Sequence, residues 1–283
     1  MKKILLILIS FFIVLNGIEI KPKNVKNANT ALLILEEKNI KNPKLTFDSQ
    51  NIDFYSYPNK KDKYYALIPI SYYKEKKDFR IIISYIKNEK KVFKGITINV
   101  IDGKYKSETI NVSKGKVTLS IKNKARVQKE YEEAMSIYKT VSPKLYLKGK
   151  FIYPINSKIT SEFGTKRVYN GTLKSYHSGT DFKAKIGTEI KAVNDGIVVL
   201  SKNRFYAGNS IVIDHGQGIY SCYYHLSKLN LKIGQKVKKG EVVGLSGDTG
   251  RVTGPHLHFA FRVHGIQVDP LQLITLINKN NIY

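Results

Sequence analysis

The chain has 283 residues, which favours two domains because a single domain usually spans about 100–200 residues. Hydrophobic residues make up 42% and charged residues 25% of it, a balance that excludes a wholly disordered chain. The formal net charge of +26 excludes an acidic surface and favours a polyanionic neighbour such as nucleic acid, membrane headgroups or an acidic wall polymer. The sequence is also rich in Lys, Ile and Asn, so a general bias in amino-acid composition could produce the same charge without a polyanionic partner. Both explanations stay open.

The first residues form a targeting signal. Lys2 and Lys3 precede an apolar run over residues 4–15, which as a helix would rise about 18 Å, less than the roughly 30 Å of a bilayer core. A basic start and a short apolar run predict a secretory signal over residues 1–20, and export to the periplasm or cell envelope. Residues 16–18 make a poor cleavage site, so retention as an N-terminal anchor in the inner membrane is the alternative. Export argues against nucleic acid as a partner.

The pattern over residues 30–122 predicts a small β-sandwich that is immunoglobulin-like in outline. Apolar and polar positions alternate over residues 64–73, 79–86, 92–100 and 107–112, and turn residues such as those at 102–103 separate these runs. This part contains no His and no Cys, so no metal site is expected in it. We expect it to serve in binding or spacing.

A helical linker is predicted over residues 123–150. Its apolar residues recur at steps of three and four, which is typical of an amphipathic helix. The residues in this stripe, which we expect to pack, are Val127, Tyr131, Ala134, Met135, Tyr138 and Val141. Pro143 ends the helix because proline cannot continue the hydrogen-bond ladder. The fold class expected is therefore all-β, with two β domains joined by a helix.

Residues 151–283 form the second β domain, and they contain all six histidines. In the run over residues 256–263, His256 and His258 alternate with apolar residues, which predicts a strand with both imidazoles on one face. Residues two apart on a strand lie about 6.5–7 Å apart. One imidazole could therefore bind a metal while the other reaches a water molecule on it. Two histidines on a solvated face are the alternative.

His177 and Asp181 form a second donor pair. A straight strand would hold them about 13 Å apart, too far for one ion whose ligand bonds are near 2 Å. Gly179 between them would permit a sharp bend that brings them together. A hydrogen-bonded His–Asp couple in a turn is the alternative for this pair taken alone.

Together His177, Asp181 and His258 offer two nitrogens and one carboxylate and leave a position open, the donor pattern of a catalytic zinc site. Such an ion lowers the pKa of bound water to about 7. His225 and His256 are then candidates to accept the water's proton and stabilise the oxyanion. Cys222, the single cysteine, excludes an internal disulfide and is interpreted as a buried small residue.

Several motifs over about residues 155–270 resemble, in sequence order, the lysostaphin/LytM-type zinc metallopeptidases, which are peptidoglycan endopeptidases. They are ITSEFGTKRVYNG, HSGTDFKAKIGTEIKAVNDGIVV, GNSIVIDHGQGIYSCYYHLSKLNLKIGQKVKKGEVVGLSGDTG and TGPHLHFAFRVHGIQVDP. The resemblance implies a β-sheet peptidase domain over residues 151–283 with lipoyl-like hairpin elements. It also implies hydrolysis of amide bonds in the peptide stems or cross-bridges of peptidoglycan.

The same resemblance assigns roles to individual residues. It implies zinc ligands at His177, Asp181 and His258, and catalytic histidines at His225 and His256. Substrate contacts are expected from Arg167, Tyr169 and Asn170, while His215 is expected to be structural and His264 to be a solvated loop residue. Two alternatives stay open: an inactive relative that binds the wall or activates an amidase, and a lipoyl-type carrier.

Overall fold

The computed structural model describes residues 17–110, 120–169 and 173–283. Most of the predicted targeting segment, residues 1–16, lies outside the described residues. Strand β1 (Ile18–Lys21) nevertheless begins within that segment and pairs antiparallel with β3 (Thr30–Glu36), so residues 18–20 belong to the folded part. Among the residues that the structure describes, no helix combines the length and apolar character needed to cross a membrane.

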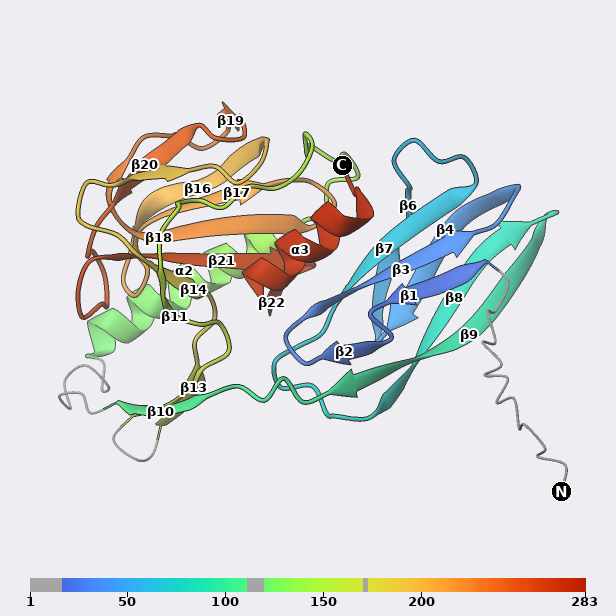
Figure 1. The fold of residues 1–283 in the computed structure, drawn as a ribbon, viewed down its shortest axis with the longest axis horizontal. Coiled ribbons are helices and arrows are strands. Elements are labelled where there is room, and N and C mark those ends of the chain that lie inside the picture. Colours follow the sequence, from blue (N-terminus) through green and yellow to red (C-terminus); the bar gives the residue numbers. More distant parts are fainter. Residues whose placement is uncertain (1–16, 111–119, 170–172) are drawn as a thin grey trace, which may run out of the picture.

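Residues 18–101 form two sheets that pack on each other around an apolar core (Figure 1). The first sheet has the order β1-β3-β7-β6 and the second β2-β9-β8-β4-β5. The remaining strands are β2 (Asn24–Lys26), β4 (Ile40–Phe47), β5 (Gln50–Asp53), β6 (Tyr55–Ser56), β7 (Lys63–Pro69), β8 (Asp78–Lys87) and β9 (Lys90–Ile101). Alternation along β8 buries Ile81, Ile83 and Tyr85, as period-two patterning requires.

A ten-stranded sheet carries the second half of the chain, with the main order β11-β14-β21-β18-β17-β16-β19 and with β15, β20 and β22 attached to it. Its strands are β11 (Ile159–Ser161), β14 (Thr180–Lys183), β15 (Glu189–Lys191), β16 (Gly196–Arg204), β17 (Gly208–Asp214), β18 (Ile219–Leu229), β19 (Lys236–Val237), β20 (Val242–Ser246), β21 (His256–Val263) and β22 (Ile266–Val268). Phe259 and Phe261 of β21 join the main core, whereas Ala260 belongs to a second cluster on the other face. The fold is thus mainly β, as predicted.

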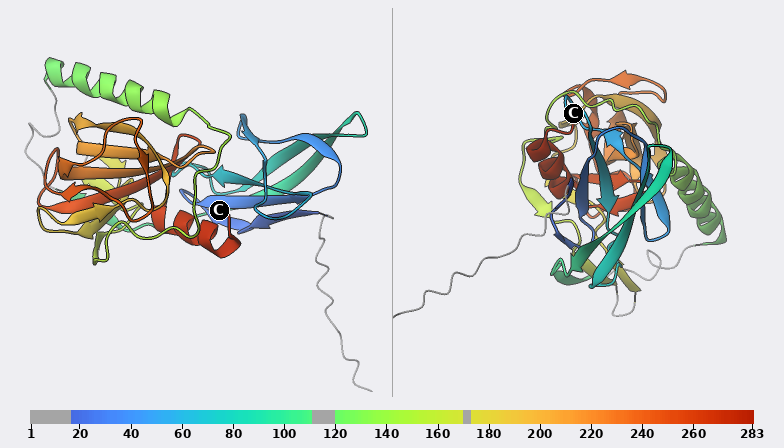
Figure 2. Two further views of the ribbon diagram at one scale, coloured as in Figure 1. Left: turned by 90° about the horizontal axis from the view of Figure 1, so that it is seen from above. Right: turned by 90° about the vertical axis from the view of Figure 1, so that its right-hand side faces the viewer.

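Helix α2 (Ile121–Tyr138) begins at Ser120, whose hydroxyl accepts a hydrogen bond from the Asn123 amide. It ends at residue 138, well before the predicted end of the linker at 150. The helix lies along the large sheet (Figure 2), and Lys202 of β16 donates to Glu133 over 2.6 Å. The predicted packing stripe is partly wrong, because Tyr131 is 57% exposed while Tyr138 is 2% exposed.

The chain reaches the large sheet's side of the molecule before helix α2. The strand predicted over residues 107–112 is described as β10 (Ser107–Ile110), and it pairs in parallel with β12 (Lys166–Tyr169) rather than with the strands that precede it. β12 in turn pairs with β13 (Leu173–Tyr176). Segments on both sides of α2 in the sequence therefore meet in this small sheet, just before His177.

The two halves share apolar core. Every second residue of β3 points toward the large sheet's half, so Leu32 and Ile34 join the cluster that contains Leu273 and Ile277 of helix α3 (Pro270–Asn280). The alternate residues of β3 point into the core between the two smaller sheets. Gln272 of α3 adds a pair of hydrogen bonds, one from its side-chain amide to the Thr30 carbonyl and one from the Thr30 amide, each 2.9 Å long.

Candidate metal centre

Four side chains line up across neighbouring strands of the large sheet. Strand register places Ser161 opposite Asp181, Asp181 opposite His258, and His258 opposite Tyr224. Residues directly opposite in antiparallel strands have Cβ atoms about 4.5–5.5 Å apart, so these side chains can interact. The Tyr224 ring stacks on the His258 ring with centroids 5.5 Å apart and planes 11° apart.

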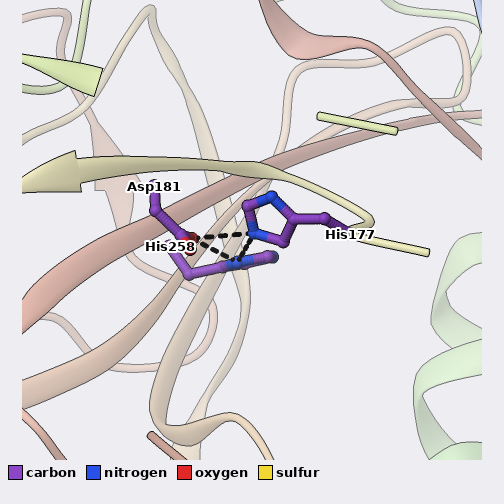
Figure 3. A group of neighbouring side chains, drawn as sticks. All are labelled: His177, Asp181 and His258. Carbon is purple, nitrogen blue, oxygen red and sulfur yellow. Dashed lines mark hydrogen bonds and ion pairs between the residues drawn. The ribbon is translucent and has the colours of Figure 1, made fainter. Parts of the chain in front are cut away.

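His177 reaches this row from the turn that precedes β14 (Figure 3). Its Nε2 atom lies 2.9 Å from Oδ1 of Asp181 and 3.1 Å from Nδ1 of His258, and the last two atoms are 2.8 Å apart. All three residues are buried at the site. The structure thus brings together the three donors that the sequence selected, and the predicted convergence of His177 and Asp181 is present.

Hydrogen bonds orient the lone pair of His177 toward Asp181. Nδ1 of His177 lies 2.8 Å from the carbonyl oxygen of Glu162, which can only accept, so Nδ1 carries the hydrogen and Nε2 presents a lone pair. That lone pair faces a carboxylate oxygen, and two electron-pair donors repel unless a cation lies between them. Two imidazole nitrogens and one carboxylate oxygen are also ligands that zinc prefers. The donor set therefore fits a metal ion.

The two remaining candidate histidines lie beside this centre. The His225 ring centroid is 5.0 Å from that of His256 and 5.9 Å from that of His258. Nδ1 of His256 donates to the Gly254 carbonyl, and Nδ1 of His225 donates to the Thr249 carbonyl. Both histidines consequently keep Nε2 available as a proton acceptor.

His225 points into the site because β18 is irregular there. The pairing of β18 with β17 shifts register between residues 209 and 211, and His225 adopts the left-handed conformation with φ of 62°. Its amide donates to the Ala207 carbonyl. A bulge of this kind can turn a side chain to the opposite face of a strand, and such backbone strain is concentrated at functional sites.

Burial sets the protonation of these groups. Burial and, to a smaller extent, the neighbouring His258 lower the pKa of His225 to about 3, so His225 is neutral at pH 7. Burial also lowers the pKa of His258, against the opposing effect of Asp181. Burial opposes ionisation of Asp181, but the adjacent His177 and His258 imidazoles outweigh it and hold the pKa of this carboxyl well below its usual range. Neutral imidazoles and an ionised carboxylate are the forms that bind a metal.

The structure describes two of the three residues predicted to contact substrate. Arg167 donates from Nε to Glu108 over 2.8 Å and from Nη2 to Ser161 Oγ over 3.3 Å, and that hydroxyl lies 3.1 Å from Nδ1 of His177. Tyr169 is the last residue of β12. Asn170 lies outside the described residues.

Three other predicted residues lie away from the three metal donors. His215 is fully buried between the Asp195 carbonyl and the Ser221 hydroxyl, in agreement with a structural role. Cys222 is buried in the cluster beneath α2, as predicted. The prediction of a solvated His264 is wrong, because it is half-buried and burial lowers its pKa to about 4.

Residues 175–270 match Peptidase family M23. Over 123 residues the chain is 47% identical to the peptidoglycan DD-endopeptidase ShyA of Vibrio cholerae, an alignment that covers 42% of this chain and 29% of ShyA. It is 35% identical over 119 residues to the DD-carboxypeptidase/endopeptidase Mpg of Neisseria meningitidis, covering 42% of this chain and 27% of Mpg. The chain thus spans less than a third of the length of either of these relatives.

The fold as a whole also has a counterpart. A crystal structure from Pseudomonas aeruginosa, described as a peptidase M23, superimposes with a TM-score of 0.67 at 24% identity and covers 87% of this chain and 93% of that chain. This likeness extends over most of the chain, whereas the alignments with ShyA and Mpg each cover 42% of it. Residues 175–270 are therefore a domain of peptidase family M23.

Proposed function

We propose that this protein is a zinc-dependent endopeptidase that hydrolyses amide bonds in the peptide stems or cross-bridges of peptidoglycan. The observation that carries the proposal is the convergence of His177, Asp181 and His258, whose donor atoms all lie within 4.8 Å of one another. The names of the relatives, peptidoglycan DD-endopeptidases among them, supply the substrate class.

In this mechanism His177, Asp181 and His258 hold the metal. A bound zinc ion would polarise the scissile carbonyl and make a water molecule acidic enough to ionise near pH 7. His225 and His256 each donate through Nδ1 to a backbone carbonyl, so Nε2 of one can accept the attacking water's proton and return it to the leaving amine. The other, once protonated, can donate a hydrogen bond to the oxyanion of the tetrahedral intermediate.

We also propose the organisation of the chain expected from its sequence. The predicted signal over residues 1–20, whose last three residues belong to β1, acts in export to the periplasm or cell envelope, or remains as an inner-membrane anchor. The β-sandwich domain predicted over residues 30–122 corresponds to the two sheets of residues 18–101. Residues 123–150 form a linker, and residues 151–283 form the lysostaphin-type peptidase domain. The apolar packing between β3 and α3 supports close contact between the two β domains.

The test is a digest of purified peptidoglycan sacculi, with and without a chelator, followed by fragment analysis. His177→Ala and Asp181→Ala should abolish bound metal and activity together. His225→Ala and His256→Ala should keep the metal and lower turnover by about 10²–10⁴-fold, the usual contribution of a positioned acid or base. The matched control is His264→Gln. His256 is the first residue of β21, whereas His264 follows its last residue, at the opposite end of the strand.

Each alternative has its own outcome in this experiment. Fragments that form equally well with a chelator present would contradict the metal's role. Sacculi that bind the parent protein and yield no fragments would favour an inactive wall-binding or amidase-activating relative. Histidine variants that digest as fast as the parent would show that the roles of His225 and His256 are wrong.

A further inference from the structure

A cavity lies between the two halves of the molecule. It has a volume of about 540 Å³. Its lining comes from the loop after β7, from the segment around β10, and from strands β12 and β13. The lining residues are Asn27, Tyr72, Tyr73, Lys76, Asp102, Tyr105, Ser107, Lys166, Arg167, Val168 and Ser175. All but Ser175 precede the segment that matches the peptidase family.

Two chains of contact connect this cavity to the metal donors. Arg167 lines the cavity and donates to Ser161 Oγ, which lies against Nδ1 of His177. Tyr72 also lines the cavity, and its hydroxyl donates to the Gly164 carbonyl over 3.0 Å. The Gly164 amide in turn donates to the His177 carbonyl over 2.8 Å. A ligand in the cavity would therefore contact residues that are linked to His177 through one intermediate residue each.

Stacked aromatic rings hold the cavity's shape. Tyr72 lies parallel to Tyr176 with centroids 3.9 Å apart, and Tyr105 stacks on Tyr72 at 5.2 Å. Tyr73 is 72% exposed, yet its ring is held edge-on against both Tyr72 and Tyr176. An aromatic ring that is exposed and already fixed loses little conformational entropy when a ligand packs on it.

The charge of the lining favours an anion. Three basic residues, Lys76, Lys166 and Arg167, and one acidic residue, Asp102, line the cavity. Arg167 is already paired with Glu108, so Lys76 and Lys166 are the two basic residues left to bind an anion. The Asp102 carboxylate also accepts the Lys104 amide, which satisfies part of its hydrogen-bonding capacity. Peptide stems of peptidoglycan carry free carboxylates, and charge-assisted hydrogen bonds to them are stronger than neutral ones.

We propose that this cavity is a substrate subsite that binds a free carboxylate of a peptidoglycan peptide stem, with Lys76 and Lys166 facing the carboxylate and Tyr73 packing against the stem. The proposal rests on the proposed function. It adds that residues outside the peptidase segment select the substrate, and that cross-linked stems with free carboxylates are cut faster than stems whose carboxylates are amidated.

The test uses soluble cross-linked stem dimers, either with free carboxylates or after chemical amidation, and the full chain loaded with metal. The parent should cut the free dimer about 10–100-fold more efficiently in kcat/KM, the effect expected from one or two hydrogen bonds to a charged group. The double variant Lys76→Gln/Lys166→Gln should raise KM for the free dimer by a similar factor, leave kcat nearly unchanged and lose the discrimination. Tyr73→Ala should raise KM for both dimers.

Matched controls separate a local subsite from general charge. Lys90→Gln/Lys91→Gln, at the β8–β9 hairpin, removes the same charge from outside the cavity lining, and Phe93→Ala removes another exposed aromatic ring, which is 62% exposed. Both should match the parent. Arg167 is left unchanged because it also supports Ser161 beside His177.

The outcomes distinguish the subsite from the proposed function. Equal cleavage of free and amidated dimers, or equal KM for the cavity double variant and its control, would overturn the subsite while the endopeptidase stands. If the parent cuts neither dimer, the proposed function fails, and calorimetric binding of the free dimer tests the cavity alone. Weaker binding only by the cavity variant would then support it, and equal binding would refute it.

Discussion

Gly179 lies in the turn between His177 and Asp181. The sequence predicts that a glycine is needed here to permit a sharp bend, but the structure shows a different reason. Gly179 is not among the glycines with positive φ. A Cβ atom there would instead collide with the His258 ring and lie 2.6 Å from the Phe259 carbonyl oxygen. Glycine is needed at this position because β21 approaches closely.

Gly179→Ala should therefore displace His258 and weaken metal binding. We expect a loss of about 10–100-fold in metal affinity, the range seen when a residue that orients a ligand is changed. Competition with a chromophoric chelator would measure it. Ser178→Ala, the adjacent residue, adds no atom and should bind metal like the parent. An alanine at 179 with unchanged affinity would show that the contact with His258 is easily relieved.

The sequence predicts the metal donors but not the residues that orient them. His177, Asp181 and His258 could be selected because their donor types and spacing are local features. Tyr224 and Ser161 join the site only through strand register, which no local pattern contains. His225 could be named, but its direction depends on a bulge in β18. The Glu162 carbonyl belongs to the backbone, so no residue type in the sequence could predict its contact with His177.

At the scale of single elements, helix α2 shows where periodicity succeeds and where it fails. The three- and four-residue steps predict the helix correctly, but they do not say how deeply each apolar residue is buried. The sheet fully buries Ala134 and Tyr138, and it covers Met135 and Ile137 only in part. The Tyr138 hydroxyl lies 3.3 Å from that of Tyr224, which stacks on His258, and the Arg262 guanidinium lies 4.5 Å from the Tyr138 ring centroid.

Tyr138→Ala should destabilise the protein by about 3–5 kcal/mol, the cost of deleting a large buried aromatic side chain. Tyr138→Phe removes only the hydroxyl and should cost about 1 kcal/mol. Urea unfolding measures both changes. Tyr131→Ala, on the same helix but 57% exposed, is the control and should shift stability by less than about 0.5 kcal/mol. Equal effects at 131 and 138 would contradict the observed packing of α2.

For the whole molecule, the mainly β fold could be predicted from alternating patterns, but the contact between its halves could not. β3 is buried on both faces because it lies between two cores. A continuous apolar run indicates that both faces of a strand are buried, but it does not indicate which elements bury them. The covering element, α3, lies more than 200 residues further along the chain, as the Thr30–Gln272 hydrogen bonds show.

Leu32→Ala and Leu45→Ala form a matched pair that tests this shared core. Both side chains are fully buried, so each change should cost about 2–5 kcal/mol. Leu32 belongs to the cluster that includes α3, whereas Leu45 lies between the two smaller sheets. Native-state hydrogen exchange should therefore show faster opening of α3 amides in Leu32→Ala than in Leu45→Ala, because only the first loosens the packing of α3 on β3. If α3 is equally protected in both variants, the two halves are not stabilised through β3, and each must hold its own core without the other.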